Sequence, residues 1–296
     1  MTTAETTKSI IGRPDWLPEE AWPFEIRTAD VAGVPVAYTD EGEGRTLLLV
    51  HDGMWSYMWG QVIERLSGSF RVVTLDFPGS GLSPDSDRPV TLESDSELLE
   101  SFVDKLGLKR FTLVAHDLGG GVGVGLAARR PDLVEGMVLT NTFAWPPHVR
   151  SLRVMLKTMG SGFMTGLDAT TNLIPRLSAG SFGVGRHLDH AGRTAFVGPF
   201  REKGPRRRFH QLMASVMEES DYLIDLERAL STTLSGKPVL TIYGERNDPF
   251  GFQARFKEHL PDNEEMIIPK GLHFPMCDDP EAFAERVSRW HTASLT

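Results

Sequence analysis

The chain has 296 residues, enough for one large domain or two small ones, and its 40% hydrophobic and 24% charged residues are ordinary globular composition. The formal net charge of −9 disfavours a nucleic acid partner, because binding to a phosphate backbone needs a basic surface. A single cysteine, Cys277, excludes an intrachain disulfide framework.

The first residues, 1–14, are polar and rich in threonine, and they lack the charged and apolar segments of a secretory signal. No apolar run approaches the roughly 18 residues that a membrane span needs. We therefore expect a cytoplasmic protein, monomeric or homodimeric, that binds neither a membrane nor nucleic acid. The expected partner is a small apolar molecule, and no metal or cofactor is predicted.

Short apolar runs alternate with helical patterns along most of the chain. Two strands with alternating polarity come first and predict an antiparallel edge, at residues 25–28 and 34–38. Apolar runs predict six buried strands, at 46–50, 71–75, 111–115, 136–140, 238–243 and 264–268. Helices are expected between them, at 61–66, 92–106, 120–129 and 280–290. This alternation predicts an α/β fold with a mostly parallel, eight-stranded sheet flanked by helices.

The segment 143–235 interrupts the alternation of strands and helices. It contains helical patterns at 150–159, 206–218 and 223–230 and no strand pattern of weight. We interpret it as a helical cap inserted into a core formed by 1–142 and 236–296. The consecutive Arg206, Arg207 and Arg208 are expected to form a solvated face of a cap helix.

The strongest candidate for chemistry is Asp117, in the segment Ala115–His116–Asp117–Leu118–Gly119–Gly120. It follows a buried strand and opens a helix, which is the pattern of a nucleophile elbow. A carboxylate at this place displaces a leaving group from sp³ carbon and forms an alkyl-enzyme ester. An ordinary helix N-cap is the alternative role of Asp117.

A histidine and an acid follow the last two predicted strands. His273 stands in Gly271–Leu272–His273–Phe274–Pro275, where the base of such a site is expected. Asp248, in GERNDP, is predicted to orient the imidazole of His273 and to stabilise its cation. Glu245 is the rival acid. Asn141, after the fourth buried run, offers an amide and not an acid.

The loop His51–Asp52–Gly53–Met54–Trp55 follows the first central strand. Backbone N–H groups at Gly53 and Met54, together with that of Leu118, are expected to face the oxygen of the ester intermediate. The turn DFPGSGLS after the next strand is expected to be structural.

Taken in order, HDGM, DFPGSGLS, AHDLGG, NTFAWP, GERNDP and GLHFP resemble the α/β-hydrolases of the haloalkane dehalogenase and epoxide hydrolase group. The resemblance covers roughly residues 25–145 and 235–293 and is weak in the cap. It implies an Asp117–His273–Asp248 triad, hydrolysis in two steps through a covalent ester, and no cofactor.

Several positions depart from that resemblance. Dehalogenases usually carry a halide-binding Trp directly after the nucleophile, where this chain has Leu118. We therefore expect an indole N–H of Trp55 or Trp145 to replace it. Epoxide hydrolases use cap tyrosines, and only Tyr222 lies in the predicted cap. A protonated Asp52, raised in pKa by a neighbouring carboxylate, would be another donor to a leaving oxygen.

Three functions remain open from the sequence. The first is a dehalogenase-like hydrolase, the second an epoxide hydrolase, and the third a repurposed member that binds a ligand under its cap without catalysis. An ordinary esterase is disfavoured, because neither serine nor cysteine stands at the elbow.

Overall fold

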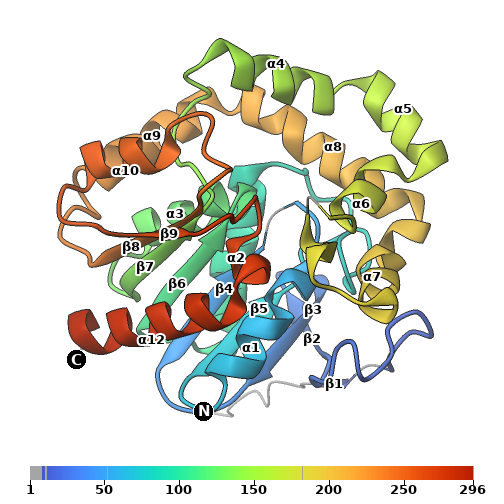
Figure 1. The fold of residues 1–296 in the computed structure, drawn as a ribbon, viewed down its shortest axis with the longest axis horizontal. Helices are drawn as coiled ribbons and strands as arrows, with labels where there is room; N and C mark the ends of the chain where they lie inside the picture. Colours follow the sequence, from blue (N-terminus) through green and yellow to red (C-terminus); the bar gives the residue numbers. More distant parts are fainter. Residues whose placement is uncertain (1–8, 11, 52, 182, 296) are drawn as a thin grey trace.

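The structure, a computed structural model, describes residues 9–10, 12–51, 53–181 and 183–295 (Figure 1). Its centre is one nine-stranded sheet in the order β1-β2-β3-β5-β4-β6-β7-β8-β9. The strands are Ser9–Ile10, Arg27–Val31, Val34–Glu41, Thr46–Val50, Arg71–Leu75, Phe111–His116, Val134–Thr140, Val239–Gly244 and Glu264–Ile268, from β1 to β9. Eight of these strands were predicted, and the two-residue β1 extends the edge beside β2.

The strand directions agree with the sequence patterns. The apolar strands β4 to β9 pair in parallel, whereas β2 and β3 form an antiparallel edge, with β3 antiparallel to β5. All five residues of β4 are buried, which is why the strand is apolar throughout and does not alternate.

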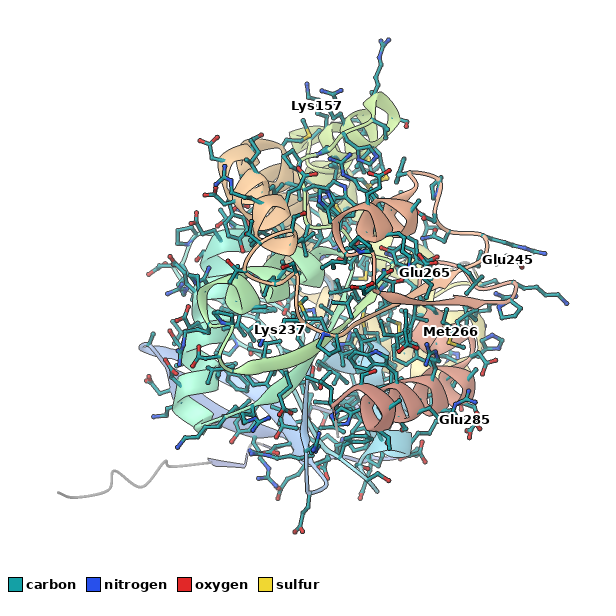
Figure 2. All side chains as sticks on the ribbon, turned by 90° about the vertical axis from the view of Figure 1, so that its left-hand side faces the viewer. Lys157, Lys237, Glu245, Glu265, Met266 and Glu285 are labelled. Carbon is teal, nitrogen blue, oxygen red and sulfur yellow. The ribbon has the colours of Figure 1, made fainter. Side chains whose placement is uncertain are left out.

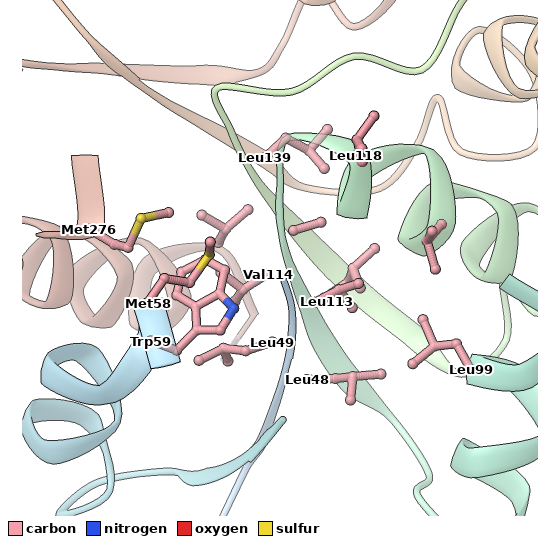
Figure 3. Packing of buried hydrophobic residues seen from close by; sticks show 14 of the residues in the cluster. Leu48, Leu49, Met58, Trp59, Leu99, Leu113, Val114, Leu118, Leu139 and Met276 are labelled. Atoms are coloured by element: carbon pink, nitrogen blue, oxygen red, sulfur yellow. The ribbon is translucent and has the colours of Figure 1, made fainter. Parts of the chain in front are cut away.

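Both faces of the sheet are covered by helices. The core helices are α1 (Gly60–Leu66), α2 (Leu92–Leu106), α3 (Leu118–Arg129), α10 (Phe252–His259), α11 (Pro275–Asp278) and α12 (Pro280–Leu295), with a 3-10 turn η1 at Ser56–Trp59. Successive strand residues enter different layers (Figure 3). Leu49 and Val114 face Trp59 in that view, and Leu48 faces the side of Leu99 in α2.

The residues between β7 and β8 form helices that lie over one end of the sheet (Figure 1). Their elements are α4 (Arg150–Met159), α5 (Gly162–Thr171), α6 (Leu173–Ser178), η2 (Val184–Arg186), α7 (His190–Val197), η3 (Gly198–Arg201), α8 (Lys203–Glu218) and α9 (Ser220–Leu230). The helices expected at 150–159, 206–218 and 223–230 correspond to α4, α8 and α9. The domain boundaries at 142/143 and 235/236 stay a prediction.

The expected solvated face of three arginines is wrong for two of them. Arg206 and Arg208 are buried, and only Arg207 is exposed. Arg206 donates to the carbonyls of Asp168 and Ala169 in α5, and Arg208 donates to Asp95 in α2. Within the described ranges, no helix is both long and apolar enough to cross a bilayer.

Candidate active site

Asp117 lies in a strained turn between β6 and α3. Its φ of 48° and ψ of −123° are unusual for a residue with a side chain, and such strain concentrates at functional sites. The N–H of Asp117 donates to the carbonyl of Thr140, and the hydroxyl of Thr142 donates to the carbonyl of Asp117. The ends of β6 and β7 thus hold the turn in the geometry expected of a nucleophile elbow.

Two glycines allow the helix to start this close to the sheet. A Cβ atom at Gly119 would lie 2.4 Å from the carbonyl oxygen of His51, and one at Gly120 would lie 1.7 Å from the hydroxyl oxygen of Thr142. Both distances are far inside van der Waals contact, so neither position accepts a side chain without displacing its neighbour.

His273 is brought to Asp117, as the sequence predicted. Its Nε2 atom lies 3.7 Å from Oδ2 of Asp117. Burial raises the pKa of Asp117, but the charge of the nearby His273 outweighs it, with help from His116 and the N–H of Leu118. The net result is a pKa below the ordinary value, so this carboxylate is ionised at neutral pH.

The adjoining His116 has a different state. Burial, with the nearby His273 adding to it, lowers the pKa of His116 to about 3. Its Nδ1 atom lies 3.0 Å from the carbonyl oxygen of Thr140, so this neutral ring donates there. His116 therefore packs beneath the elbow and does not act as a second base at neutral pH.

Asp248 is not placed as the sequence predicted. Its two carboxylate oxygens accept the N–H groups of Phe252 at 2.7 Å and Gln253 at 3.0 Å. Asp248 thus caps the first turn of α10, where free N–H groups need acceptors. The expectation that this carboxylate orients the imidazole is corrected by that geometry.

The side chain in contact with Nδ1 of His273 is that of Asn247, which the sequence patterns did not predict for the site. Its Nδ2 atom lies 3.0 Å from Nδ1 of His273. Asn141 holds it in place, because the amide of Asn141 donates to the carbonyl of Asn247 at 2.8 Å. The Oδ1 atom of Asn141 accepts the N–H of Gly244 at 2.9 Å. Asn247 could have been predicted from the sequence, because Asp248 directly precedes a helix and is a favoured residue for capping its first turn.

Glu245, the rival acid, lies elsewhere. Its Oε2 atom accepts the N–H of Lys270 at 2.7 Å, and Figure 2 shows the residue at the periphery of the molecule. This bond, with the N–H of Arg246 donating to the carbonyl of Gly271 at 3.0 Å, joins the loops that follow β8 and β9. Glu245 therefore fixes the position of the His273 loop from outside the site.

The loop after β4 is only partly described. Gly53 and Met54 are buried near the elbow, and a Cβ atom at Gly53 would contact the side chains of Leu118 and Phe209. The backbone N–H of Leu118 helps to lower the pKa of Asp117. Asp52 lies outside the described residues, so its expected role as a proton donor stays a prediction.

Asp76 anchors the far end of this loop. Its Oδ1 and Oδ2 atoms accept the N–H groups of Ser56 and Leu82, each at 2.8 Å. Burial raises the pKa of Asp76 to about 6, although these two donors oppose the shift. The turn that follows β5 is therefore structural, as expected, and it also fixes the loop beside the elbow.

Neither of the two expected tryptophan donors reaches the site. The indole N–H of Trp55 donates to the carbonyl of Phe196 at 3.0 Å. Trp145 is buried against Phe256, with the guanidinium of Arg255 over its ring. Both expectations are corrected, because one indole is already bonded and the other packs behind the site.

The candidate site opens into a cavity of about 380 Å³ between the sheet and the cap helices α4 and α8. It is lined by Asp117, Leu118, Asn141, Phe143, Leu152, Met155, Leu156, Met159, Phe209, Met213, Asn247, Asp248, Pro249, Phe250, Phe252 and His273. Most of the lining is apolar, and the polar groups gather at the elbow. Among these described residues there is neither a tryptophan nor a tyrosine.

A buried ion pair holds the cap side of the cavity together. Nδ1 of His210 lies 2.6 Å from the carbonyl oxygen of Met159, and Nε2 lies 3.2 Å from Oδ2 of Asp168. Each ring nitrogen of His210 thus faces an oxygen of a different cap helix. Burial raises the pKa of Asp168, but the bond from His210 and the N–H of Ile174 together bring it below the ordinary value.

The described residues contain no group of three or more His, Cys, Asp or Glu side chains that could hold a metal ion.

Comparison with known families gives one match over most of the chain. The family profile described as the alpha/beta hydrolase fold matches residues 46–280.

Two relatives are similar over nearly the whole chain. Haloalkane dehalogenase 2 of Mycobacterium tuberculosis (strain ATCC 25618 / H37Rv) is 29% identical over 287 residues, covering 92% of this chain and 97% of the relative. A cis-3-alkyl-4-alkyloxetan-2-one decarboxylase of Shewanella oneidensis is 27% identical over 291 residues, covering 93% and 90%.

Solved structures show the same fold. Haloalkane dehalogenase DbeA from Bradyrhizobium elkani superposes with a TM-score of 0.80 at 22% identity, over 90% of this chain and 97% of that one. The epoxide hydrolase CorEH has a TM-score of 0.79 at 19% identity, over 90% and 98%.

Proposed function

The chain belongs to the α/β-hydrolase fold family, and we propose that it hydrolyses a small apolar molecule with Asp117 as nucleophile and His273 as base. The main support is the geometry of the elbow. An ionised carboxylate lies in a strained turn, 3.7 Å from an imidazole, at the polar end of an apolar cavity. The similarity to a haloalkane dehalogenase supports the same class of reaction.

In the first step an oxygen of Asp117 attacks an sp³ carbon of the substrate. The new C–O bond forms an alkyl-enzyme ester while the bond to the leaving group breaks, and that group departs with the electron pair. The apolar walls hold the alkyl part and exclude water, which keeps the carboxylate reactive. The ester carbonyl then faces the N–H of Leu118 and the loop containing Gly53 and Met54.

In the second step His273 removes a proton from a water molecule. The resulting hydroxide attacks the ester carbonyl, the bond from that carbonyl to the alkoxy oxygen breaks, and the alcohol takes up a proton. Asp117 is regenerated with one oxygen from the water. A carboxylate nucleophile thus turns over through an intermediate that can be isolated when the base is removed.

A dehalogenase-like reaction on a haloalkane is the first candidate, and opening of a strained cyclic ether is the second. The donors in the cavity lining favour neither candidate over the other. A halide leaving an apolar cavity needs N–H donors, and no indole lines this cavity within the described residues. The oxygen of an opened epoxide leaves as an alkoxide, which needs a proton donor in its turn, and no tyrosine lines this cavity within the described residues.

The test is product formation from bromoalkanes, chloroalkanes and epoxides by the wild type, Asp117→Asn and His273→Gln. We expect Asp117→Asn to lose at least about 10⁴-fold in turnover with any accepted substrate, because no ester forms without the carboxylate. His273→Gln should form the ester and fail to hydrolyse it, which mass spectrometry detects as a covalent adduct on the peptide containing Asp117.

The outcomes separate the candidate functions. Halide release that needs Asp117 supports the dehalogenase-like reaction, and diol formation without halide release supports the epoxide reaction. Binding of an apolar ligand that is equal in the wild type and Asp117→Asn, with no adduct in His273→Gln, would overturn the proposed catalysis in favour of a binding protein.

A further inference from the structure

We propose that the cap binds an anionic lipid surface through the outer face of α4 and the start of α5. This outer cap face is defined by Arg150, Arg153, Val154, Lys157 and Phe163, three basic and two apolar side chains. The proposal goes beyond the proposed function and does not depend on it, because it concerns binding of the protein to lipid and not the reaction in the cavity.

The helices α4 and α5 form the outermost layer of the cap (Figure 1). Both pack on α8, which lies between them and the sheet in that view. Figure 2 places Lys157 at the outer end of the molecule, on the cap. A flat surface can therefore approach this layer without first meeting the core.

The sequence gives α4 two faces. Leu152 and Leu156 are buried and line the cavity, so they form the inner face. The residues of the opposite face follow one another at spacings of three or four, and all of them are exposed: Arg150, Arg153, Val154 and Lys157. Because such spacings place side chains on one side of a helix, these four form a continuous outer stripe.

The exposed charges of α4 and α5 are all positive. The two helices contain a single acidic residue, Asp168, and it is buried against His210. Residues 150–201 contain seven Lys and Arg but only two Asp and Glu, although the net charge of the whole chain is −9. Among the residues that the structure describes, no acidic side chain pairs with the three cations of the outer cap face. This segregation of charge favours an anionic partner for the cap.

The apolar side chains of the outer cap face favour lipid as that partner. Phe163 is 76% exposed and Val154 is 56% exposed, so both stand in water beside the basic side chains. Helices that lie in a bilayer interface combine apolar side chains, which enter the headgroup region, with Lys and Arg, which meet anionic headgroups. A purely acidic partner would meet the charges and leave Phe163 in water, whereas a lipid surface takes up both.

The sequence predicted no membrane partner, because no apolar run is long enough to span a bilayer. A helix that lies on a bilayer needs no such run. The proposal therefore concerns the bilayer surface alone and replaces that prediction there. Because the inner face of α4 lines the cavity, a bound bilayer would lie over the cavity, close to any apolar molecule dissolved in it.

The experiment is co-sedimentation of the full chain with lipid vesicles, without substrate. One set of vesicles is phosphatidylcholine, and the other contains about 30% phosphatidylglycerol. Each basic side chain near an anionic surface contributes about fivefold to the partition coefficient, so we expect binding to the anionic vesicles to be at least about 20-fold stronger at low salt. Raising the salt to about 0.5 M should remove most of this difference.

Two variants separate charge from apolar contact. Arg153→Glu/Lys157→Glu should weaken binding to anionic vesicles by at least about 20-fold, because two attractions become repulsions. Phe163→Ser should weaken it about three- to tenfold and leave its salt dependence unchanged, since only apolar area is lost. These side chains are exposed, so the melting temperatures should stay within a few degrees of the wild type.

The matched control is Lys105→Glu/Lys109→Glu, which changes the net charge of the chain by the same amount. Both lysines are exposed, and they precede β6, whereas the cap lies over the ends where the parallel strands finish. We expect this control to bind anionic vesicles within about threefold of the wild type, because it leaves the outer cap face intact.

Several results would overturn the proposal. These are absence of wild-type binding at low salt, equal binding to neutral and anionic vesicles, or an equal loss in the control and in Arg153→Glu/Lys157→Glu. If the wild type ignores lipid and self-associates in a way that Arg153→Glu/Lys157→Glu abolishes, the face belongs to a second copy of the chain. None of these results bears on Asp117, whose role is tested separately by the covalent adduct.

Discussion

The two sides of the cavity are each held by a buried aspartate, and the two carboxylates are stabilised in opposite ways. On the sheet side, Asp76 accepts N–H groups of Ser56 and Leu82, and burial raises its pKa to about 6. On the cap side, Asp168 pairs with His210, and its pKa is lowered despite burial. Burial raises the pKa of both aspartates. The two backbone donors only reduce this rise at Asp76, whereas the partner of Asp168 reverses it.

The opposite pKa shifts predict opposite responses of the two aspartates to acid. Asp168 has a pKa below its unfolded value of 3.8, so its contribution to stability is present above that pH and is lost as the pH falls through the folded pKa. Asp76 has a raised pKa, so its contribution is fully present below pH 3.8 and is lost as the pH rises through about 6. Acid therefore weakens the contribution of Asp168 on the cap side and strengthens that of Asp76 on the sheet side.

The largest effect is expected from removing the partner of Asp168. His210→Phe leaves a buried carboxylate without its cation, which should lower the free energy of unfolding by about 3–5 kcal/mol. Denaturant unfolding at pH 7 measures this. Asp168→Asn is the matched control, since its amide can donate to a neutral His210, and it should lose less than half as much. Equal losses in the two variants would contradict a charged pair.

The corresponding change on the sheet side should be smaller. Asp76→Asn turns one acceptor into a donor facing a backbone N–H, which should lower the free energy of unfolding by about 1–3 kcal/mol. The wild type should lose stability between pH 4 and pH 6 as Asp76 ionises, and this slope should be reduced in the variant. An unchanged slope would assign the titration to another buried carboxylate, of which Asp95, also raised to about 6, is the first to examine.

Acid should separate the two sides without a mutation. Below about pH 4 we expect the amides of α4, α5 and α8 to exchange hydrogen faster than those of β4 and β5, since the cap side loses the buried pair of Asp168 and His210 while protonation of Asp76 stabilises its own surroundings. Hydrogen exchange with mass spectrometry resolves these segments. Uniform exchange across both sides would mean that the cap and sheet unfold as one unit.

The smallest effect concerns the cap wall of the cavity. Met155 lines the cavity and is 39% exposed, so Met155→Ala should change the free energy of unfolding by less than about 1 kcal/mol. The widened wall should raise KM for short substrates about two- to tenfold and leave kcat nearly unchanged. A large fall in kcat would show that α4 positions the reacting carbon.

The core was predictable because its strands are continuous apolar runs between turn residues. The expected strands at 46–50, 71–75 and 264–268 have the observed bounds of β4, β5 and β9. In the cap the pattern is weaker, and α5, α6 and α7 were missed. Only Met164 and Asp168 are buried in α5, so its sequence contains no apolar face that periodicity would reveal.

The site residues were predictable where a motif fixes the backbone. They were not predictable where either of two adjacent side chains could contact the histidine. Asp117 and His273 follow from the elbow and from the loop after β9. The exchange of Asn247 for Asp248 depends on which side chain caps α10, and a shift of one residue decides it. The buried Arg208 depends on Asp95, 113 residues away, which no local pattern contains.

The elbow also bears on how such a chain can change in evolution. A methyl group at Gly119 or Gly120 would overlap His51 or Thr142, so these two positions are closed to substitution. The side chain at 117 lines the cavity instead. A single codon at 117 can therefore exchange a carboxylate for another nucleophile while the scaffold around it is inherited intact, which lets one ancestral fold diversify its chemistry.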